Sequence, residues 1–283
     1  MSDMTTRETT DVARAAAALT EHDVAAFARD GFVIKRAFFT RGQIAALHDA
    51  LTNDEALRRR TYDRRDGDGG AVELALWNQP GDDSFGALAR SERLVGAAAQ
   101  LLGGEVYHYH SKLNTKRPGA GGTWVWHQDY GYWYDNGCLV PDLVTAAVAV
   151  SAMSVANGCL KLLRGSHRAG RIDHGRVGEQ TGADPDRVAS LEQRFDAVEF
   201  EAQPGDMMLF HCNTLHTSAP NRSDHTRELL LVAYNARSND PVKAHHHPGY
   251  TPIDVLPDRA IEDRAGRYEG ERRTFMPPRD DLA

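Results

Sequence analysis

The sequence predicts a mainly β protein with an N-terminal layer of helices, and two observations support this fold class. Before residue 105, apolar runs with helical spacing follow capping-box patterns. After it, short runs of β-branched and aromatic residues alternate with turn signals, which is typical of an all-β sandwich or barrel. The sequence contains no internal repeat, low-complexity tract or linker composition, so residues 1–283 are expected to form a single domain.

The helical layer is expected over about residues 20–104. Thr20 begins the capping-box pattern TEHD before VAAFARD, and Thr40 begins TRGQ before IAALHDAL. The run GFVIKRAFF between these two helices has the composition of a strand. Ser91 is the expected N-cap of a third helix, which ends at Leu102 because two glycines follow.

Two segments are expected to act as lids. Residues 53–84 lack periodicity and are rich in charged residues and glycine, so they are predicted to be a long irregular segment. Such segments inside a domain are often functional lids or mobile loops. Residues 168–192 are the second candidate lid.

The β core is expected over about residues 105–250, followed by a C-terminal extension over about residues 251–283. Asn157-Gly158 is the strongest hairpin signal in the chain and is predicted to join two neighbouring strands. Pro204-Gly205-Asp206 predicts a further turn. The predicted strands comprise residues 105–116, 124–129, 143–153, 159–165, 197–203, 206–211 and 228–236.

Charge and cysteine usage narrow the possible partners and location. A net charge of -7 and a pI near 6.0 argue against nucleic acid or an anionic membrane as partner, and the cluster Arg58–Arg60 is expected to be solvated. The polar, acidic N-terminus is not expected to act as a signal peptide, and no apolar run approaches membrane-spanning length. Cys138, Cys159 and Cys212 are odd in number and lack CxxC spacing, which predicts neither disulfides nor a thiolate zinc site, and favours a reducing cytoplasm.

The stretch GTWVWHQDYGYW, residues 122–133, carries the first chemical signal. On a strand, residues i and i+2 face the same way, so His127 and Asp129 present an imidazole and a carboxylate to one point. Together they provide two of the three ligands of the facial triad that holds non-haem Fe(II). Taken alone, an isolated HxD pattern favours a chance surface pair or a hydrogen-bonded core histidine, and a third ligand would come from far along the chain.

A second stretch, QPGDMMLFHCNTLHTSAPNRSDHTRELLLVAYN at residues 203–235, completes a set of ordered motifs. With HQD, PGD, HTSAPNRS and the arginine that opens the next strand, and with GFVIKRAFF and NGCLKLLRGSH, the chain resembles the phytanoyl-CoA dioxygenase family of Fe(II)/2-oxoglutarate oxygenases and its ectoine-hydroxylase-like members. The resemblance extends from about residue 23 to about residue 250. It implies a double-stranded β-helix, the jelly-roll or cupin-like core.

The resemblance also implies the reaction. The expected enzyme uses Fe(II), 2-oxoglutarate and O2 to oxidise an unactivated C–H bond of a small-molecule substrate, while 2-oxoglutarate is converted to succinate and CO2. Hydroxylation is the preferred outcome, and desaturation, epoxidation or ring formation are alternatives. The resemblance makes His127, Asp129 and His216 the iron ligands. Arg227 would hold the distal carboxylate of 2-oxoglutarate with its guanidinium fork, and Ser218 would add a hydroxyl to that carboxylate.

Further residues are expected around this centre. The resemblance makes Asn114 a cosubstrate contact and places Trp133 near the substrate. Tyr132 is a candidate for the same substrate wall, although both aromatic residues are equally consistent with a structural role.

On the predicted strand before the HxD motif, alternate residues are expected to share one polar face, with Lys112 at the cosubstrate end. A solvated edge strand is the alternative for Lys112 and His110. That face consists of Val106, His108, His110, Lys112 and Asn114.

An ambiguity concerns the third ligand, because His211 and Arg222 have the same spacing as His216 and Arg227. We prefer the second pair, since Arg227 opens an apolar strand while Arg222 lies in the turn-like segment APNRSD.

The run His245–His247 is expected to be an exposed loop without a metal.

Two other classes of function are kept as alternatives. One is a halogenating relative of the same fold, in which a small residue replaces the carboxylate ligand; Asp129 occupies that position here. The other is a non-redox, cupin-like binding protein or hydrolase that uses the same motif with zinc. Ser218 and Arg227 argue against it, because neither has an obvious purpose without an anionic cosubstrate.

Overall fold

The N-terminal helices begin where the capping boxes predict them in the computed structural model, which describes residues 18–59, 61–66, 68–119 and 122–267. Helix α2 (Glu21–Asp30) follows Thr20, whose hydroxyl accepts a hydrogen bond from the Asp23 amide, and α3 (Arg41–Asn53) follows Thr40 in the same way with Gln43. Helix α6 (Glu92–Leu102) follows Ser91, whose side chain makes no capping hydrogen bond. The predictions about the first 17 residues and about residues 268–283 lie outside the described residues.

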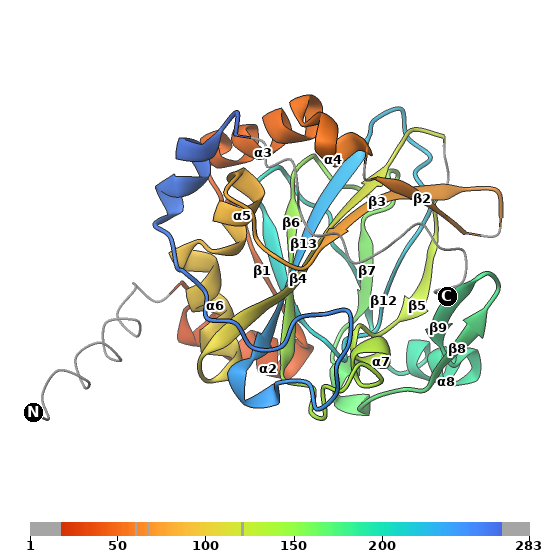
Figure 1. The fold of residues 1–283 in the computed structure, drawn as a ribbon. Helices are drawn as coiled ribbons and strands as arrows, with labels where there is room; N and C mark the ends of the chain where they lie inside the picture. Colours follow the sequence, from red (N-terminus) through yellow and green to blue (C-terminus); the bar gives the residue numbers. More distant parts are fainter. Residues whose placement is uncertain (1–17, 60, 67, 120–121, 268–283) are drawn as a thin grey trace, which may run out of the picture.

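Two antiparallel sheets form the centre of the molecule, with a separate hairpin at one side (Figure 1). The larger sheet has the order β1-β11-β6-β13-β4-β3-β2, with β1 (Phe32–Lys35), β2 (Tyr62–Arg65), β3 (Ala71–Trp77), β4 (Val106–Lys116), β6 (Leu143–Ala149), β11 (Met207–His211) and β13 (Arg227–Ala236). The smaller sheet has the order β10-β7-β12-β5, with β5 (Trp124–His127), β7 (Leu160–Leu163), β10 (Ala197–Glu199) and β12 (His216–Ser218). The separate hairpin consists of β8 (His174–Val177) and β9 (Gln180–Ala183).

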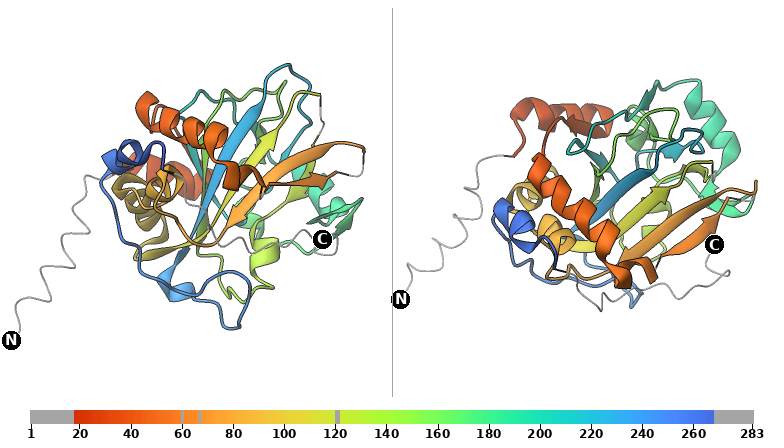
Figure 2. Two further views of the ribbon diagram at one scale, coloured as in Figure 1. Left: turned by 45° about the horizontal axis from the view of Figure 1, so that its top comes forward. Right: turned by 90° about the horizontal axis from the view of Figure 1, so that it is seen from above.

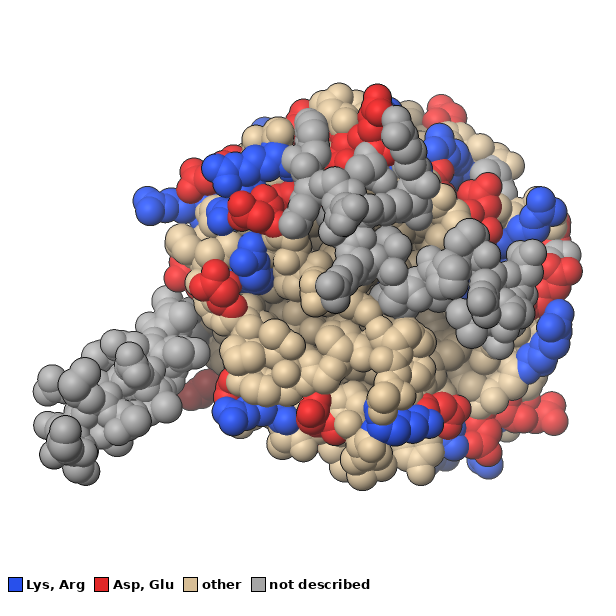
Figure 3. All heavy atoms as spheres, viewed as in Figure 1, with Lys and Arg blue, Asp and Glu red and all other residues tan. Residues whose placement is uncertain are grey.

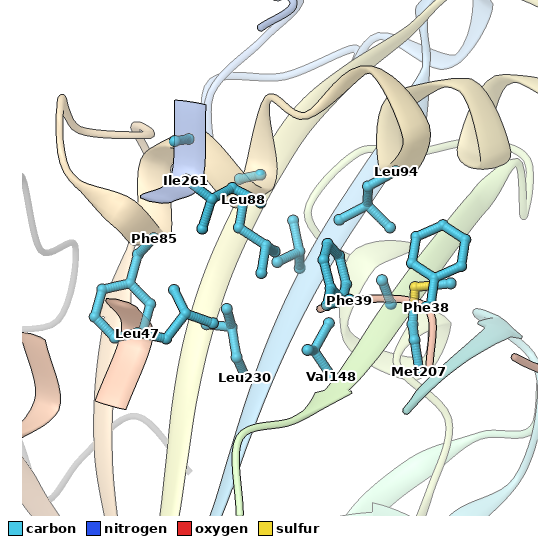
Figure 4. Packing of buried hydrophobic residues seen from close by; sticks show 14 of the residues in the cluster. Phe38, Phe39, Leu47, Phe85, Leu88, Leu94, Val148, Met207, Leu230 and Ile261 are labelled. Carbon is cyan, nitrogen blue, oxygen red and sulfur yellow. The ribbon is translucent and has the colours of Figure 1, made fainter. Parts of the chain in front are cut away.

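Helices cover one face of the larger sheet, and the smaller sheet covers the other. The helical face is closed by α2, α3, α5 (Ser84–Ala89), α6 and the 3-10 helix η4 (Asp258–Arg264), and Figure 4 shows Leu47, Phe85 and Leu94 of these helices against Leu230 and Val148 of the sheet. On the inner face, residues such as Phe210 and Leu231 pack with Leu162 of the smaller sheet. This arrangement confirms the mainly β, jelly-roll core with an N-terminal helical layer.

The prediction that residues 53–84 are irregular is wrong. They form α4 (Glu55–Arg59), β2 and β3, and β3 pairs with both β2 and β4. The alternation in AVELALW buries Val72 and Leu74, while the charged turn before it hides the pattern of the hairpin. The second candidate lid is also structured, as η2 (Ser166–Ala169), β8, β9 and α8 (Pro185–Glu192).

The predicted hairpin at Asn157-Gly158 is also wrong, although the turn exists and Gly158 has a φ of 74°. Strands β6 and β7 belong to different sheets. Strand β6 is already flanked by β11 and β13, so it has no free edge for β7. The turn therefore carries the chain from one sheet to the other. The predicted turn at Pro204-Gly205-Asp206 is confirmed, with Gly205 at a φ of 93°.

Strand β4 contains a β-bulge that splits its predicted polar face. Ala233 is paired with His110 and Tyr234 with His108, which leaves Tyr109 as the extra residue. Val106 and His108 consequently face the helical side, where the His108 Nε2 atom lies 2.8 Å from Ser111 Oγ. The strand lies between β13 and β3, so the alternative of a solvated edge strand is wrong as well.

No helix of the described residues combines the length and the apolar character that crossing a bilayer requires. On the face shown in Figure 3, acidic and basic side chains are interspersed around the rim, and uncharged residues occupy much of the middle. The further views in Figure 2 show the β2–β3 hairpin and the β8–β9 hairpin projecting at the same side of the molecule, away from α5, α6 and η4. The first hairpin pairs with β4 and the second contacts β5, and both of these strands line the cavity described next.

Candidate active site

Three side chains with metal-binding atoms converge between the two sheets. His127 at the end of β5 and His216 at the start of β12 are cross-strand partners, and their ring centroids lie 4.1 Å apart. Asp129 follows β5 by two residues, with its Oδ1 atom 3.9 Å from His216 Nε2. One ligand atom from each residue lies within 4.8 Å of the others. The structure therefore brings together the three residues that the family resemblance selects.

Hydrogen bonds fix the orientation of this group. His127 Nδ1 lies 2.8 Å from the Val125 carbonyl oxygen and His216 Nδ1 lies 3.0 Å from the Thr214 carbonyl oxygen. A carbonyl can only accept, so each Nδ1 carries the proton and each Nε2 keeps its lone pair. Burial lowers the pKa of both rings, which keeps them neutral.

Thr145 holds the carboxylate from the opposite sheet. Its hydroxyl on β6 donates to Asp129 Oδ2 at 2.9 Å, which leaves Oδ1 on the side of the histidines. Two neutral imidazoles and one carboxylate are the donor set that non-haem Fe(II) takes, with hydrogen-bonded outer partners. The residues present fit Fe(II). Thr145 was not identified from the sequence, although a lone polar residue inside the apolar run LVTAAVAV is a signal.

The ligand group opens into a cavity between the sheets. Its walls come from seven strands and from Asp129, so neither sheet could form the cavity without the other. The lining residues are His110, Lys112, Asn114, Trp124, His127, Asp129, Thr145, Leu160, Phe210, His216, Thr217 and Leu231. Three polar residues of β4 thus face the cavity, as predicted, namely Lys112, His110 and Asn114.

Arg227 lies fully buried behind Asn114. Its Nη1 atom donates to the backbone and side-chain oxygens of Asn114 at 3.1 and 3.2 Å. Its Nε and Nη2 atoms, which lie on one edge of the guanidinium, have no hydrogen-bond partner among the described residues. Burial lowers the pKa of Arg227 only to about 10, so the group is charged at neutral pH. A buried cationic fork with two free donors fits a carboxylate group of 2-oxoglutarate.

Ser218 is held by a lysine that was not identified from the sequence. Lys116, the last residue of β4, is fully buried and its Nζ donates to Ser218 Oγ at 2.7 Å. The signal was available, since Lys112, Asn114 and Lys116 alternate along one strand and share a face.

Two cationic side chains lie beside Trp124, a residue of the cavity lining. Lys112 Nζ lies 5.1 Å from the centre of the Trp124 ring, and the guanidinium carbon of Arg64 on β2 lies 4.4 Å from it. Burial lowers the pKa of Lys112, while the charge of Asp129 raises it. Within the described part of the chain, Arg64 has no ion-pair partner.

The two predicted substrate contacts lie one layer behind the cavity lining. Trp133, in the short helix α7 (Tyr130–Trp133), packs its ring 5.7 Å from the ring of His110. Tyr132 lies with its ring 6.1 Å from that of His127, and its hydroxyl donates to the Thr181 carbonyl oxygen at 2.7 Å. Neither is among the residues that line the cavity.

The remaining histidine predictions have mixed outcomes. His211 packs beside Phe27 and His167, away from the cavity lining, and Arg222 is exposed, so the structure does not bring that pair to the ligand group. The expectation of an exposed loop at 245–247 is wrong for His247. It is buried because the loop folds back onto β4, where its ring stacks on that of His110 at 4.8 Å.

Comparisons with known proteins agree with this geometry. Residues 27–229 match the family model described as phytanoyl-CoA dioxygenase. L-proline trans-4-hydroxylase from Streptomyces griseoviridis is 34% identical over 193 residues, which cover 62% of this chain and 70% of that protein. Ectoine dioxygenase from Halomonas elongata is 32% identical over 229 residues, covering 75% and 69%.

Solved structures are similar as well. The crystal structure of apo EctD from S. alaskensis superposes with a TM-score of 0.72 and 25% identity, covering 86% of this chain and 90% of that one. The structure of EctD with 2-oxoglutarate and 5-hydroxyectoine gives a TM-score of 0.67 and 26% identity, covering 91% and 87%. With the family model, the sequence relatives and the fold in agreement, the chain belongs to the phytanoyl-CoA dioxygenase family and is an Fe(II)/2-oxoglutarate-dependent dioxygenase.

Proposed function

We propose that this dioxygenase hydroxylates an aliphatic C–H bond of a small, amino-acid-derived metabolite that carries a carboxylate. The observation that carries the proposal is the cationic region formed by Arg64 and Lys112 beside Trp124. The names of the relatives support it, because they act on L-proline and on ectoine. The carboxylate of Asp129 argues against a halogenase, in which a small residue would stand at that position.

We assign the cofactor contacts as follows. His127, Asp129 and His216 hold Fe(II), and Arg227 holds the distal carboxylate of 2-oxoglutarate with help from Ser218. The support is the proximity of the three ligand atoms, which lie within 4.8 Å of one another, and the pair of donors on the buried guanidinium that have no partner among the described residues. When bound, Fe(II), 2-oxoglutarate and O2 supply the oxidative decarboxylation to succinate and the oxidation of the substrate.

The chain's own residues then provide orientation and exclusion of water. The Val125 and Thr214 carbonyls keep both ligand nitrogens deprotonated, and Thr145 keeps the carboxylate turned toward them. Apolar residues of both sheets, among them Phe210 and Leu231, close the cavity on the sides between the strands. A reactive centre enclosed in this way is protected from bulk water.

A count of charges supports an anionic substrate. Asp129 and one carboxylate of 2-oxoglutarate would offset the charge of Fe(II), and the second carboxylate would offset Arg227. Among the described residues, the carboxylate that acts on Lys112 is then that of Asp129, which already offsets Fe(II), and Arg64 has no ion-pair partner. A substrate carboxylate would meet this excess of positive charge through charge-assisted hydrogen bonds. Tyr132 and Trp133 are proposed to support the substrate wall from behind.

The test compares acids with their neutral analogues. Purified protein with Fe(II), 2-oxoglutarate and O2 should release more succinate in the presence of L-proline, ectoine or a related cyclic amino acid, and the product should be heavier by one oxygen atom. Prolinamide should stimulate much less, because it lacks the anionic group. Equal stimulation by acid and amide would contradict the carboxylate assignment.

Neighbouring arginines on β2 provide a matched pair of variants. Arg64 is half-buried on the side of Trp124, whereas Arg65 is exposed on the other side. Arg64→Gln should raise the KM for the acid substrate about tenfold or more without changing the KM for 2-oxoglutarate. Arg65→Gln should change neither value. Identical behaviour of the two variants would remove Arg64 from the substrate site.

We also propose a cytoplasmic location. The support is that Cys138, Cys159 and Cys212 are all free and buried, as thiols of a reducing compartment are. Fractionation of cells that express the tagged protein would test this, and its recovery outside the cytoplasm would contradict it.

A further inference from the structure

Two basic side chains lie next to each other in the interior with no acid between them. Lys116 of β4 and Arg227 of β13 are cross-strand partners, and both have a relative exposure of 0%. In the part of the chain that the structure describes, neither forms an ion pair with a carboxylate. Like charges opposite each other in a sheet are destabilising, and burial increases that cost.

The contacts of Lys116 constrain the hydroxyl of Ser218. Lys116 Nζ donates to Ser218 Oγ at 2.7 Å and to the Ala219 carbonyl oxygen. Once Lys116 is protonated, its ammonium group can only donate, so the Ser218 oxygen acts as acceptor and its own hydrogen points elsewhere. Gly158 closes the space behind the amine, since a Cβ atom there would lie 3.2 Å from Nζ.

The surroundings also set the proton equilibrium of Lys116. Burial, and then the charge of Arg227, lower the pKa of Lys116 to about 6. Asp66 and Cys159 act weakly in the opposite direction. Lys116 is therefore a basic group that is short of negative charge in the free protein, and an anion that arrives beside it favours its protonated form.

We propose that Lys116 is a positioning residue for 2-oxoglutarate, which directs the Ser218 hydroxyl to the distal carboxylate and adds a second positive charge beside Arg227. This inference rests on the proposed role of Arg227 as the carboxylate anchor. Binding of the cosubstrate is then coupled to the uptake of one proton from solvent, which converts the Lys116 amine into an ammonium group. The affinity for 2-oxoglutarate accordingly decreases as the pH rises.

Calorimetric titration of the Fe(II)-loaded protein with 2-oxoglutarate, without oxygen, tests the coupling directly. Buffers with different ionisation enthalpies report the protons taken up, and titrations between about pH 6 and pH 9 report the change in Kd. Wild-type protein should take up a proton on binding, and its affinity should decrease by up to about tenfold per pH unit. These readouts do not depend on turnover.

Three substitutions separate positioning from a structural role. Lys116→Met should weaken binding by about ten- to a hundredfold and remove the proton uptake. Lys116→Gln keeps a donor for Ser218, so it should recover part of the affinity but none of the pH dependence; it also carries the test if the methionine variant does not fold. Lys161→Met removes a half-buried lysine from β7, opposite Thr217, and should behave as wild type.

Arg227→Ala distinguishes failure of this inference from failure of the proposed function. If Arg227→Ala binds 2-oxoglutarate as tightly as wild type, the proposed anchor is wrong, and the inference fails with it. If Arg227→Ala binds weakly while Lys116→Met and Lys116→Gln retain wild-type affinity and proton uptake, the anchor stands and the role of Lys116 is overturned.

Discussion

Each oxygen of Asp129 has a different neighbour: Oδ2 accepts from Thr145, and Oδ1 lies toward His216. Asp129→Ala should therefore abolish substrate-dependent succinate release and weaken Fe(II) binding, while the circular dichroism spectrum stays that of a folded β protein. Thr145→Val removes only the outer hydrogen bond and should weaken Fe(II) binding by about ten- to a hundredfold. Unchanged iron affinity in a folded Asp129→Ala variant would show that the ligand lies elsewhere.

Arg227 and Arg222 differ in burial, which makes them a natural pair of variants. Arg227 is fully buried with two unpartnered donors, whereas Arg222 is exposed. Arg227→Ala should raise the KM for 2-oxoglutarate by about ten- to a hundredfold or more, because a charge-assisted bidentate contact is worth a few kcal/mol. Arg222→Ala should change it little. Steady-state kinetics at varied 2-oxoglutarate decide between them, and a defect confined to Arg222→Ala would overturn the choice of anchor.

At this scale the sequence motifs selected the three side chains that converge between the sheets, but not the residues that support them. His127, Asp129 and His216 stand in short, recognisable patterns. Thr145 and Lys116 do not, because their importance comes from the residues opposite them in space. Thr145 meets Asp129 from the other sheet, and Lys116 meets Ser218 across 102 positions of sequence. Strand periodicity states which residues share a face, but not which face looks into the cavity.

At the scale of elements, local sequence patterns predicted the helices and turns whose position depends on one segment of the chain. The capping boxes at Thr20 and Thr40 fixed two helix starts. Pairing between distant strands could not be read in the same way. The bulge at Tyr109 depends on the register with β13, and the crossover after β6 depends on β11 and β13 occupying both of its edges.

The crossover turn can be tested through its glycine. Gly158 has a φ of 74°, and a Cβ atom there would lie 2.2 Å from the Ala219 carbonyl oxygen; Gly178 has a φ of 62° and open space around it. Gly178→Ala should cost about 1 kcal/mol from backbone strain alone. Gly158→Ala should destabilise the protein by more than that, and should also weaken 2-oxoglutarate binding because Ala219 contacts Lys116. Urea denaturation measures the free energy of unfolding of both variants. Equal losses of stability would mean that the crossover tolerates the added methyl group.

For the whole molecule, buried histidines set the acid limit of stability. Burial lowers the pKa of His108 to about 4 and that of His211 to about 4, below the unfolded value near 6.5. A base whose pKa is lower in the folded state binds fewer protons there, so the free energy of unfolding decreases as the pH falls from about 6.5 to about 4. His108 alone should contribute a loss of about 2 kcal/mol between about pH 7.5 and pH 5.

Denaturation at the two pH values, with wild type and His108→Gln, measures this contribution. The glutamine amide can still donate to the Asn78 carbonyl oxygen, which His108 Nδ1 contacts at 3.0 Å. The variant should therefore be less sensitive to acid than wild type. An equal pH dependence in the two proteins would assign the acid limit to other groups.

The two hairpins beside the cavity have an evolutionary consequence. Arg64 belongs to β2, and Thr181, which holds Tyr132, belongs to the β8–β9 hairpin, whereas the proposed metal ligands belong to the smaller sheet and the loop that follows β5. Under the proposed function, the residues that select the substrate and the residues that hold the metal thus lie on separate pieces of chain. A lineage can exchange or mutate the hairpins, and so change which metabolite is oxidised, while it inherits the oxidising centre unchanged.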